Sequence, residues 1–407
     1  MREWYWSARS YLTLAGHLLR PSNRGFARYV ARDYLRFLAN AVHPIQGETR
    51  ERARAAVSWL LRAQDATRDD GVSLGYFPCE PGQTNGWRPS YPETTGYIVP
   101  SLLDFSERFK DADVYQRALR MAIWETNIQM PSGAVQGGPV CVSEEQTPAV
   151  FNTGMVLHGY TATYRVTRAP EFLEAGRRAA NFLLADLRDD GHFQTLGKFV
   201  SPNRYKTYNC LCAWPLYRFG EDVGAARYKE AAVKVIEAAI GQQQANGWYP
   251  NNCFTNSETP ITHTIGYTLQ GVLEVGLLAG REEFVASAKK GMDPLLERIS
   301  PEGFLRGSFD ANWRPGLRSS CLTGNGQLAV VCYRLYEQTG ENKYKIAADG
   351  LVNYLKALQV LDSDNPAING AIPGSFPLLG SYMTGGYPNW ATKYFLDALL
   401  LQDRLHA

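Results

Sequence analysis

The feature that most constrains the fold of this chain is an internal repeat of about 55 to 65 residues. In each repeat a charged amphipathic helix ends at a Gln, Asp-Gly or Asn-Gly sequence, a long loop follows, and a second helix rich in Gly, Thr and Tyr begins. The second helices are expected to begin near Tyr91, Phe151, Tyr205, Ile261, Cys321 and Tyr387. Because a two-helix unit cannot bury its apolar faces alone, the six repeats predict an all-α fold, an (α/α)6 toroid.

The repeat also predicts the domain organisation. It begins at about Glu51 and ends at about Arg404. A chain of 407 residues, 45% of them hydrophobic, could form one large domain or two ordinary ones, and the even repeat favours one. We expect residues 49–407 to form the toroid and residues 1–48 a short helical N-terminal extension.

Composition excludes several classes of function. The net charge of +2 argues against a nucleic-acid binder, and no apolar run is long enough for a transmembrane segment. The N-terminal region is interrupted by Arg9 and His17, unlike a secretory signal. The seven scattered cysteines are an odd number, which is typical of reduced thiols. These features predict a cytoplasmic protein.

The two kinds of helix indicate where a site lies. The first helix of each repeat has one charged face, as expected for an outer ring, whereas the second has few charges and many small residues, as expected for an inner ring. Connections from inner to outer helices are short, and those from outer to inner helices are long. All six long loops are therefore expected on one face, at the N-termini of the inner helices, where binding residues concentrate.

This face favours an anionic ligand because helix N-termini carry partial positive charge and unpaired N–H groups. Its loops add arginines and aromatic residues, which suit a sugar chain that carries uronate carboxylates. The alternative is that the aromatic residues fill the centre of the toroid. The predicted substrate-binding residues are Arg88, Tyr91, Arg204, Tyr205, Tyr208, Asn209, Trp248, Arg306, Asn325, Tyr387, Asn389 and Trp390.

Four residues are candidates for catalysis. Glu93 and Asn152 occupy the first turns of two inner helices, where a carboxylate can act as acid or base and an amide can bind a hydroxyl or carboxylate. Either residue could instead cap its helix. His263 and Tyr267 are four residues apart, so they share a helix face and could divide proton abstraction and proton donation between them.

Missing motifs narrow the chemistry further. The sequence has no Asp-rich acid motif, and only the Cys210 and Cys212 pair weakly suggests metal-ligand spacing. Glycine-rich strings such as TGNG lack a preceding strand, so nucleotide binding is not supported. We expect neither a metal nor a cofactor.

Five segments of the chain resemble segments of bacterial toroid proteins of capsule and exopolysaccharide biosynthesis, which are labelled prenyltransferase-like or terpenoid-cyclase-like. The segments are SYPETTGYIVPSLLDF, FNTGMVLHGY, THTIGYTLQGVLEVG, CLTGNGQLAV and YPNWATKYFLDALL. The likeness covers residues 50 to 405. More distantly, the chain is similar to polysaccharide lyases, unsaturated-glucuronyl hydrolases and glucuronyl C5-epimerases. Similar proteins often carry Asp at the position of Asn152, and where that Asp acts as an acid, the Asn here argues against a two-carboxylate mechanism.

Several reactions remain open. A glycosidase needs a second carboxylate besides Glu93, and the available ones are Glu144, Glu145, Glu258 and Asp310. A lyase or epimerase instead needs a Tyr or His base and a group that neutralises the uronate. The sequence slightly favours β-elimination on an acidic polysaccharide or oligosaccharide. The alternatives are a glycoside hydrolase with Glu93 as general acid/base, a uronyl C5-epimerase, or a non-catalytic glycan-binding component of polysaccharide assembly.

The N-terminal extension carries Arg24, Arg28, Arg32 and Arg36, one every four residues, in a predicted helix. Such a basic stripe could dock on an anionic membrane face or on an acidic partner such as the polysaccharide-synthesis machinery. The alternative is a solvated face or one that packs on the toroid.

Overall fold

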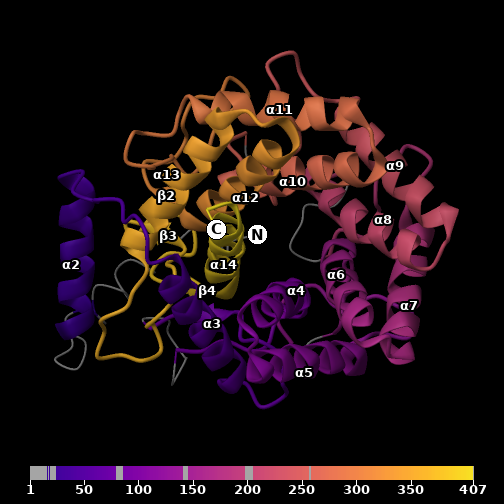
Figure 1. Cartoon of the computed structure of the whole chain (residues 1–407), viewed down its shortest axis with the longest axis horizontal. Helices are drawn as coiled ribbons and strands as arrows, with labels where there is room; N and C mark the ends of the chain where they lie inside the picture. Colours follow the sequence, from indigo (N-terminus) through magenta and orange to yellow (C-terminus); the bar gives the residue numbers. More distant parts are fainter. Residues whose placement is uncertain are drawn as a thin grey trace.

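The computed structural model describes residues 16, 18, 24–78, 86–140, 145–197, 205–255 and 258–406. These residues form two concentric rings of helices (Figure 1). The outer ring consists of α3 (Thr49–Asp65), α5 (Ala112–Ile128), α7 (Pro170–Asp186), α9 (Ala226–Ile240), α11 (Glu282–Leu296) and α13 (Asn342–Leu358). The inner ring consists of α4 (Pro92–Phe109), α6 (Val150–Thr167), η2 (Thr207–Cys212) with α8 (Ala213–Asp222), α10 (Thr262–Ala279), α12 (Leu322–Thr339) and α14 (Asn389–Leu405). The (α/α)6 toroid predicted from the repeat is confirmed.

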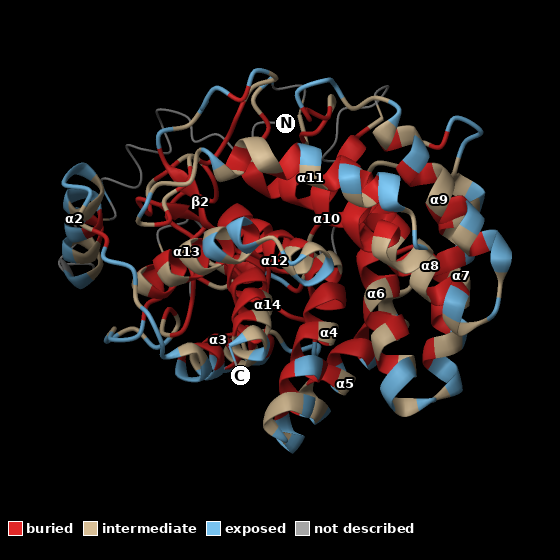
Figure 2. Ribbon diagram, turned by 45° about the horizontal axis from the view of Figure 1, so that its top comes forward, coloured by how far each residue is buried: buried red, intermediate tan, exposed pale blue. Residues whose placement is uncertain are grey.

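Burial follows the two sequence patterns (Figure 2). In the outer helix α7, the buried residues recur at helical spacing along one stripe, from Phe172 to Leu183. In the inner helix α10, every residue from Thr262 to Gly276 is buried. Helices of the inner ring contact neighbours on both sides, and for this reason their sequences lack a charged face.

Glycines set the close spacing of the inner ring. A Cβ at Gly96 of α4 would lie 2.6 Å from Val156 Cα of α6, and one at Gly159 would lie 2.6 Å from the Gly96 carbonyl oxygen. Between η2 and α10, a Cβ at Gly271 would lie 2.7 Å from the Leu211 amide nitrogen. Side chains at these positions would push neighbouring helices apart, which explains the glycine content of the second helices.

Backbone hydrogen bonds tie five of the six inner structures to the long loop of the next repeat around the ring. The first amides of five inner structures, at residues 150, 207, 262, 322 and 389, donate to carbonyls of residues 195, 251, 307, 374 and 74. The last bond joins the final repeat to the first one. The sixth inner helix begins with Pro92, which has no N–H to donate. This chain of contacts places the long loops together on one face, as predicted.

Threonines near the start of the inner helices hold the preceding loops. Thr95, Thr153 and Thr392 accept hydrogen bonds from loop amides, with Oγ1–N distances of 2.9, 3.1 and 3.0 Å. Antiparallel pairing of β1 (Gly75–Tyr76) with β4 (Tyr387–Pro388), and of β2 (Ser320–Cys321) with β3 (Ser375–Phe376), joins further loops. These bonds hold the described parts of the loops against the inner helices.

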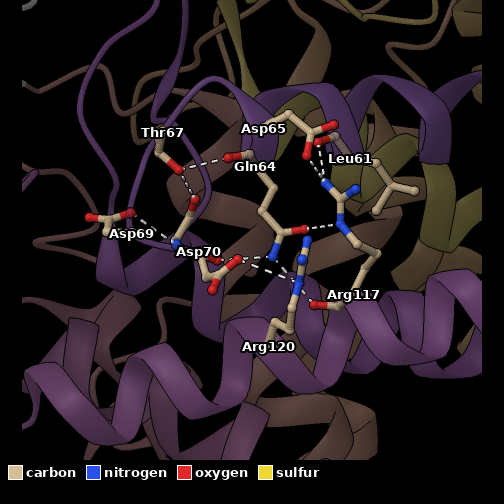
Figure 3. Close-up of polar contacts among 9 residues, drawn as sticks. Leu61, Gln64, Asp65, Thr67, Asp69, Asp70, Arg117 and Arg120 are labelled. Atoms are coloured by element: carbon tan, nitrogen blue, oxygen red, sulfur yellow. Dashed lines mark hydrogen bonds and ion pairs between the residues drawn. The ribbon is translucent and has the colours of Figure 1, made fainter.

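The first long loop is also fastened to the outer ring (Figure 3). Thr67 Oγ1 donates to the Gly71 carbonyl over 2.6 Å, and Gln64 Nε2 donates to the Asp70 carbonyl over 3.0 Å. Arg117 of α5 donates to Gln64 Oε1 and Asp65 Oδ1, both at 2.5 Å. These contacts fix the beginning of the loop that leads to Glu93.

The N-terminal extension contains the predicted helix as α2 (Arg24–Leu38), which lies at the edge of the toroid (Figure 1). Asp33 Oδ2 accepts a hydrogen bond from the Leu378 amide over 2.6 Å. A domain boundary at residue 48 stays a prediction. In the described part of the chain, no helix is both long and apolar enough to cross a membrane.

Candidate functional site

Glu93 is the second residue of α4, directly after Pro92 in the first turn. Its side chain is half-buried, and Tyr91 Oη donates to Glu93 Oε2 over 2.6 Å. Burial raises the pKa of the Glu93 carboxyl to about 7, although hydrogen bonds from Tyr91 and Tyr267 lower it. Near neutral pH this carboxyl is therefore poised both to give and to take a proton.

Six tyrosines surround Glu93. They come from the end of the first loop, α4, η2, α10, the last loop and α14: Tyr91, Tyr97, Tyr208, Tyr267, Tyr382 and Tyr394. Burial, together with the negative charge of Glu93, raises the pKa of each phenol well above 10. The tyrosines are thus neutral hydrogen-bond donors. None of them is activated as a base.

His263 and Tyr267 lie together, as their four-residue spacing predicts, with ring centroids 4.1 Å apart. His263 is 2% exposed and Tyr267 is 1% exposed. The Gln327 amide contacts His263 Nδ1 at 2.9 Å, and burial lowers the pKa of this imidazole to about 3. The pair forms part of the buried wall beside Glu93, and the imidazole is neutral at physiological pH.

Asn152 lies in the first turn of α6 and is 5% exposed. Its Nδ2 donates to the Gln136 carbonyl over 3.1 Å, and its side chain also hydrogen-bonds Tyr91. The N-cap residue of α6 is Ala149, so Asn152 does not cap the helix. Instead, Asn152 orients Tyr91, which in turn contacts Glu93.

Three predicted substrate-binding aromatic residues gather at this cluster. The Trp390 ring packs edge-on against Tyr91 at 6.2 Å, and Trp390 Nε1 donates to Tyr382 Oη over 2.9 Å. Tyr208 lies 6.3 Å from Tyr267 between ring centroids. Tyr91, Tyr208 and Trp390 therefore surround the carboxyl group as an aromatic wall.

Other predicted binding residues make contacts that build the loops. Trp248 packs edge-on against Trp313 at 5.1 Å, and Tyr387 pairs with Tyr76 in the β1–β4 ladder. Asn389 Nδ2 donates to the Ser73 carbonyl over 2.8 Å and to Thr94 Oγ1 over 2.7 Å. Asn325 Oδ1 accepts from Ser320 Oγ over 3.3 Å. A sugar-binding role for these residues stays a prediction.

The predicted cations also lie in the loops. The Arg88 guanidinium stands 4.4 Å from the centre of the Phe77 ring. Arg306 donates to the Arg318 carbonyl over 2.9 Å. Arg204 lies outside the described residues. Tyr205 and Asn209 line a small separate pocket with His192.

Glu93 differs from the other carboxylates considered. Glu145 and Glu258 are exposed, and Asp310 Oδ1 accepts loop amides of residues 312 and 314 at 2.9 and 2.8 Å. Glu144 lies outside the described residues. Within the described ranges, no group of His, Cys, Asp or Glu side chains is arranged to hold a metal ion. The described site is thus built around a single carboxyl group.

Sequence reasoning missed Tyr97 and Tyr394 as members of this site. Tyr97 follows Glu93 by four residues, so both lie on one face of α4. Tyr97 and Tyr394 rings lie 5.7 Å apart across the α4–α14 contact that closes the ring. The spacing of Tyr97 could have been read from the sequence, whereas its partner depends on ring closure.

The sequence matches no family model and no curated protein. The structure is similar to a heparin-specific unsaturated glucuronyl hydrolase, with TM-score 0.70 and 16% identity over 88% of this chain and 97% of the other. It is also similar to an unsaturated glucuronyl hydrolase from a Bacillus species, with TM-score 0.67 and 15% identity over 88% and 97%. A cellobiose 2-epimerase from Bacillus thermoamylovorans gives TM-score 0.66 and 10% identity over 92% and 99%. These similarities show that the chain shares the toroid fold of carbohydrate enzymes.

Proposed function

We propose that the chain is a carbohydrate-active enzyme that hydrolyses acidic, uronate-containing saccharides with Glu93 as general acid and base. The observation that carries this proposal is the half-buried Glu93 carboxyl, whose pKa is raised to about 7 by burial among neutral tyrosines. Two of the similar structures are hydrolases of unsaturated glucuronyl saccharides, which supports the same substrate class.

A single carboxyl suits one kind of hydrolysis. Ordinary glycosidases use two carboxylates. An unsaturated uronate has an enol ether in its ring, and protonation of its double bond creates an oxocarbenium ion without a second carboxylate. Glu93 would donate that proton and then, as the carboxylate, take a proton from the attacking water. The resulting hemiketal opens to a ketone and leaves a hemiacetal at the glycosidic carbon. Collapse of that hemiacetal to the aldehyde breaks the glycosidic bond and releases the rest of the saccharide as an alcohol.

The competing function is β-elimination, which the adjacency of His263 and Tyr267 favours. Elimination needs a base that removes the proton next to the uronate carboxylate. Burial raises the pKa of Tyr267 and lowers that of His263, so Tyr267 is hard to ionise and His263 is a weak base. We therefore rank elimination, which the sequence slightly favoured, below hydrolysis.

The proposal includes a cellular setting. We place the enzyme in the cytoplasm beside polysaccharide-synthesis machinery. The support is the resemblance of its sequence strings to proteins of capsule and exopolysaccharide biosynthesis.

One assay series tests the reaction. Purified protein is incubated with unsaturated uronate disaccharides and with saturated acidic polysaccharides, while the ultraviolet absorbance of the double bond and the reducing ends are measured. Loss of absorbance from the disaccharides is expected. A rise of absorbance from the polysaccharides would indicate a lyase, and reducing ends alone would indicate ordinary hydrolysis. No change in either signal would contradict both cleavage reactions.

Glu93→Gln tests the assigned residue. The amide keeps the shape of the side chain but cannot transfer the proton, so turnover should fall by about 100-fold or more. The matched control is Glu145→Gln, because Glu145 is an exposed loop carboxylate. Full activity of folded Glu93→Gln protein would remove Glu93 from the mechanism.

A further inference from the structure

Helix α2 has two opposite sides. One side carries Val30, Asp33 and Phe37 and packs on the toroid. The other side carries exposed residues that we call the α2 stripe: Arg28, Arg32, Leu35 and Leu38. These four positions follow helical spacing, so they form one continuous surface.

Contacts of the packed side hold α2 in place. Arg36 Nη2 donates to the Ala357 carbonyl over 3.2 Å, and the Phe37 ring lies 5.7 Å from Phe376. Asp33 is 5% exposed and is bonded to the Leu378 amide. Because Asp33 is the one acidic residue of this helix, turning it inward leaves the opposite side without negative charge.

The α2 stripe combines positive charge with apolar surface. Leu35 is 66% exposed and Leu38 is 67% exposed, and they are the two leucines of α2. Tyr34 beside them is 46% exposed. In the described part of the chain, Arg28 and Arg32 make no ion pair. Arg32 also lies over the Tyr29 ring, 5.9 Å from its centre. Exposed leucines are costly in water, and both guanidinium groups are open to an anionic ligand.

We infer that the α2 stripe docks the protein on an anionic lipid surface. Arginines next to exposed leucines on one helix face suit a lipid headgroup layer, because the cations meet anionic headgroups while the leucines enter the acyl boundary. A partner that offers only acidic groups would engage the arginines and leave the leucines in water. The combination therefore favours lipid.

The position of α2 gives this docking a consequence. Phe37 packs on Phe304 and Phe376, which belong to the fifth and sixth long loops. The docked helix would thus hold the loop face, with Glu93, close to the membrane. This consequence rests on the proposed function, whereas the docking itself does not.

Vesicle co-sedimentation of the full chain tests the inference. Vesicles of phosphatidylcholine with phosphatidylglycerol should sediment the protein, and phosphatidylcholine alone should sediment much less. The double variant Arg28→Glu/Arg32→Glu and the double variant Leu35→Ser/Leu38→Ser should each lower the fraction bound at least about tenfold. Both variants should keep wild-type activity on a soluble saccharide, since neither touches the Glu93 cluster.

Matched controls lie on the outer ring. Arg177→Glu/Lys290→Glu reverses two charges on α7 and α11, and Ile346→Ser removes an apolar side chain that is 71% exposed on α13. Both controls should bind anionic vesicles like the wild type. Absence of wild-type binding, or equal binding by the α2 variants, would overturn the inference. Loss with the charge reversals but not with the serines would also overturn it, because the leucines would then take no part in docking.

Discussion

At the scale of single residues, the site depends on how one carboxyl group is hydrogen-bonded. Tyr91 donates a hydrogen bond to Glu93 and is itself hydrogen-bonded by Asn152. Two neutral side chains therefore adjust the acidity of the Glu93 carboxyl group. Burial raises the pKa of Glu93, and the Tyr91 bond opposes that rise by stabilising the carboxylate. The balance leaves the pKa of Glu93 at about 7.

Tyr91→Phe should change this balance in a known direction. Loss of the donor destabilises the carboxylate, so the pKa of Glu93 should rise above its wild-type value of about 7. If protonated Glu93 starts the reaction, the alkaline limb of the kcat/KM profile should move to higher pH. Tyr164→Phe, at the far end of α6, is the control and should leave the profile unchanged. A shift to lower pH, or no shift, would contradict the role of Tyr91.

At the scale of elements, the inner helices are specified by small residues as much as by apolar ones. Glycines bring the helix backbones together, and threonines bind the loop amides. Outer helices follow ordinary amphipathic rules, but a few of their charged residues are buried, among them Lys356 of α13 and Glu125 of α5. Glu125 is 1% exposed, and neither carboxyl oxygen has a hydrogen-bond partner among the described residues.

Gly96→Ala should destabilise the toroid. The added Cβ would lie 2.6 Å from Val156 Cα, so α4 and α6 must separate at a cost of about 1 to 3 kcal/mol. Gly25→Ala on α2 is the control, because nothing lies within 4 Å of that Cβ. Alanine favours a helix over glycine by about 0.5 to 1 kcal/mol, so this control should be neutral or stabilising. Thermal melting compares the two, and equal melting temperatures would contradict the close helix contact.

Glu125 makes stability depend on pH. Burial raises the pKa of Glu125 well above its unfolded value of 4.5, with a smaller contribution from Asp69. The folded protein therefore holds this proton more tightly than the unfolded chain. The associated stability is present below about pH 4.5 and is lost as the pH rises toward the folded pKa.

The substitution Glu125→Met should remove the loss of folding stability that accompanies rising pH. The melting temperature of the variant should exceed that of the wild type increasingly as the pH rises from about 5 to 8, because a buried acid no longer has to ionise. Glu107→Met is the control, since Glu107 is an exposed glutamate of α4. A difference from the wild type that stays constant with pH would show that Glu125 does not titrate as the structure implies.

At the scale of the whole molecule, ring closure brings the six long loops together. The amide of Asn389 donates to the Leu74 carbonyl, and Ser101 Oγ donates to Asp397 Oδ1 over 2.5 Å across the α4–α14 contact. Ring closure also changes the expectation that free N–H groups at the inner-helix N-termini bind an anionic ligand. Five of the first inner-helix amides are bonded to neighbouring loops, so they are not free to bind an anion. The remaining attraction comes from helix dipoles and loop cations.

This attraction should still favour acidic ligands. Calorimetry should give tighter binding of a uronate oligosaccharide than of its carboxyl-reduced counterpart, and the difference should shrink as salt is raised, since exposed charges are screened over about 8 Å at physiological ionic strength. Glu93→Gln protein allows the measurement without turnover. Equal affinity for the two ligands would remove the case for a uronate substrate.

The sequence alone predicted the number of repeats, the beginning of each inner helix and the common face of the long loops. These features are local, because helical periodicity, glycine content and connection length can be read within one repeat. The position of Glu93 in a first turn and the adjacency of His263 and Tyr267 were predicted for the same reason.

Only the tertiary structure decided what surrounds Glu93. Its tyrosines come from elements between Tyr91 and Tyr394, and their convergence requires the last inner helix to pack against the first. Both Tyr208 and Trp248 are aromatic residues predicted to bind substrate, and their residue types could not show which of them lies beside Glu93. In the structure Tyr208 joins this cluster, whereas Trp248 packs between loops. Burial, and therefore the pKa values of Glu93 and His263, depends on contacts between repeats that no local pattern contains.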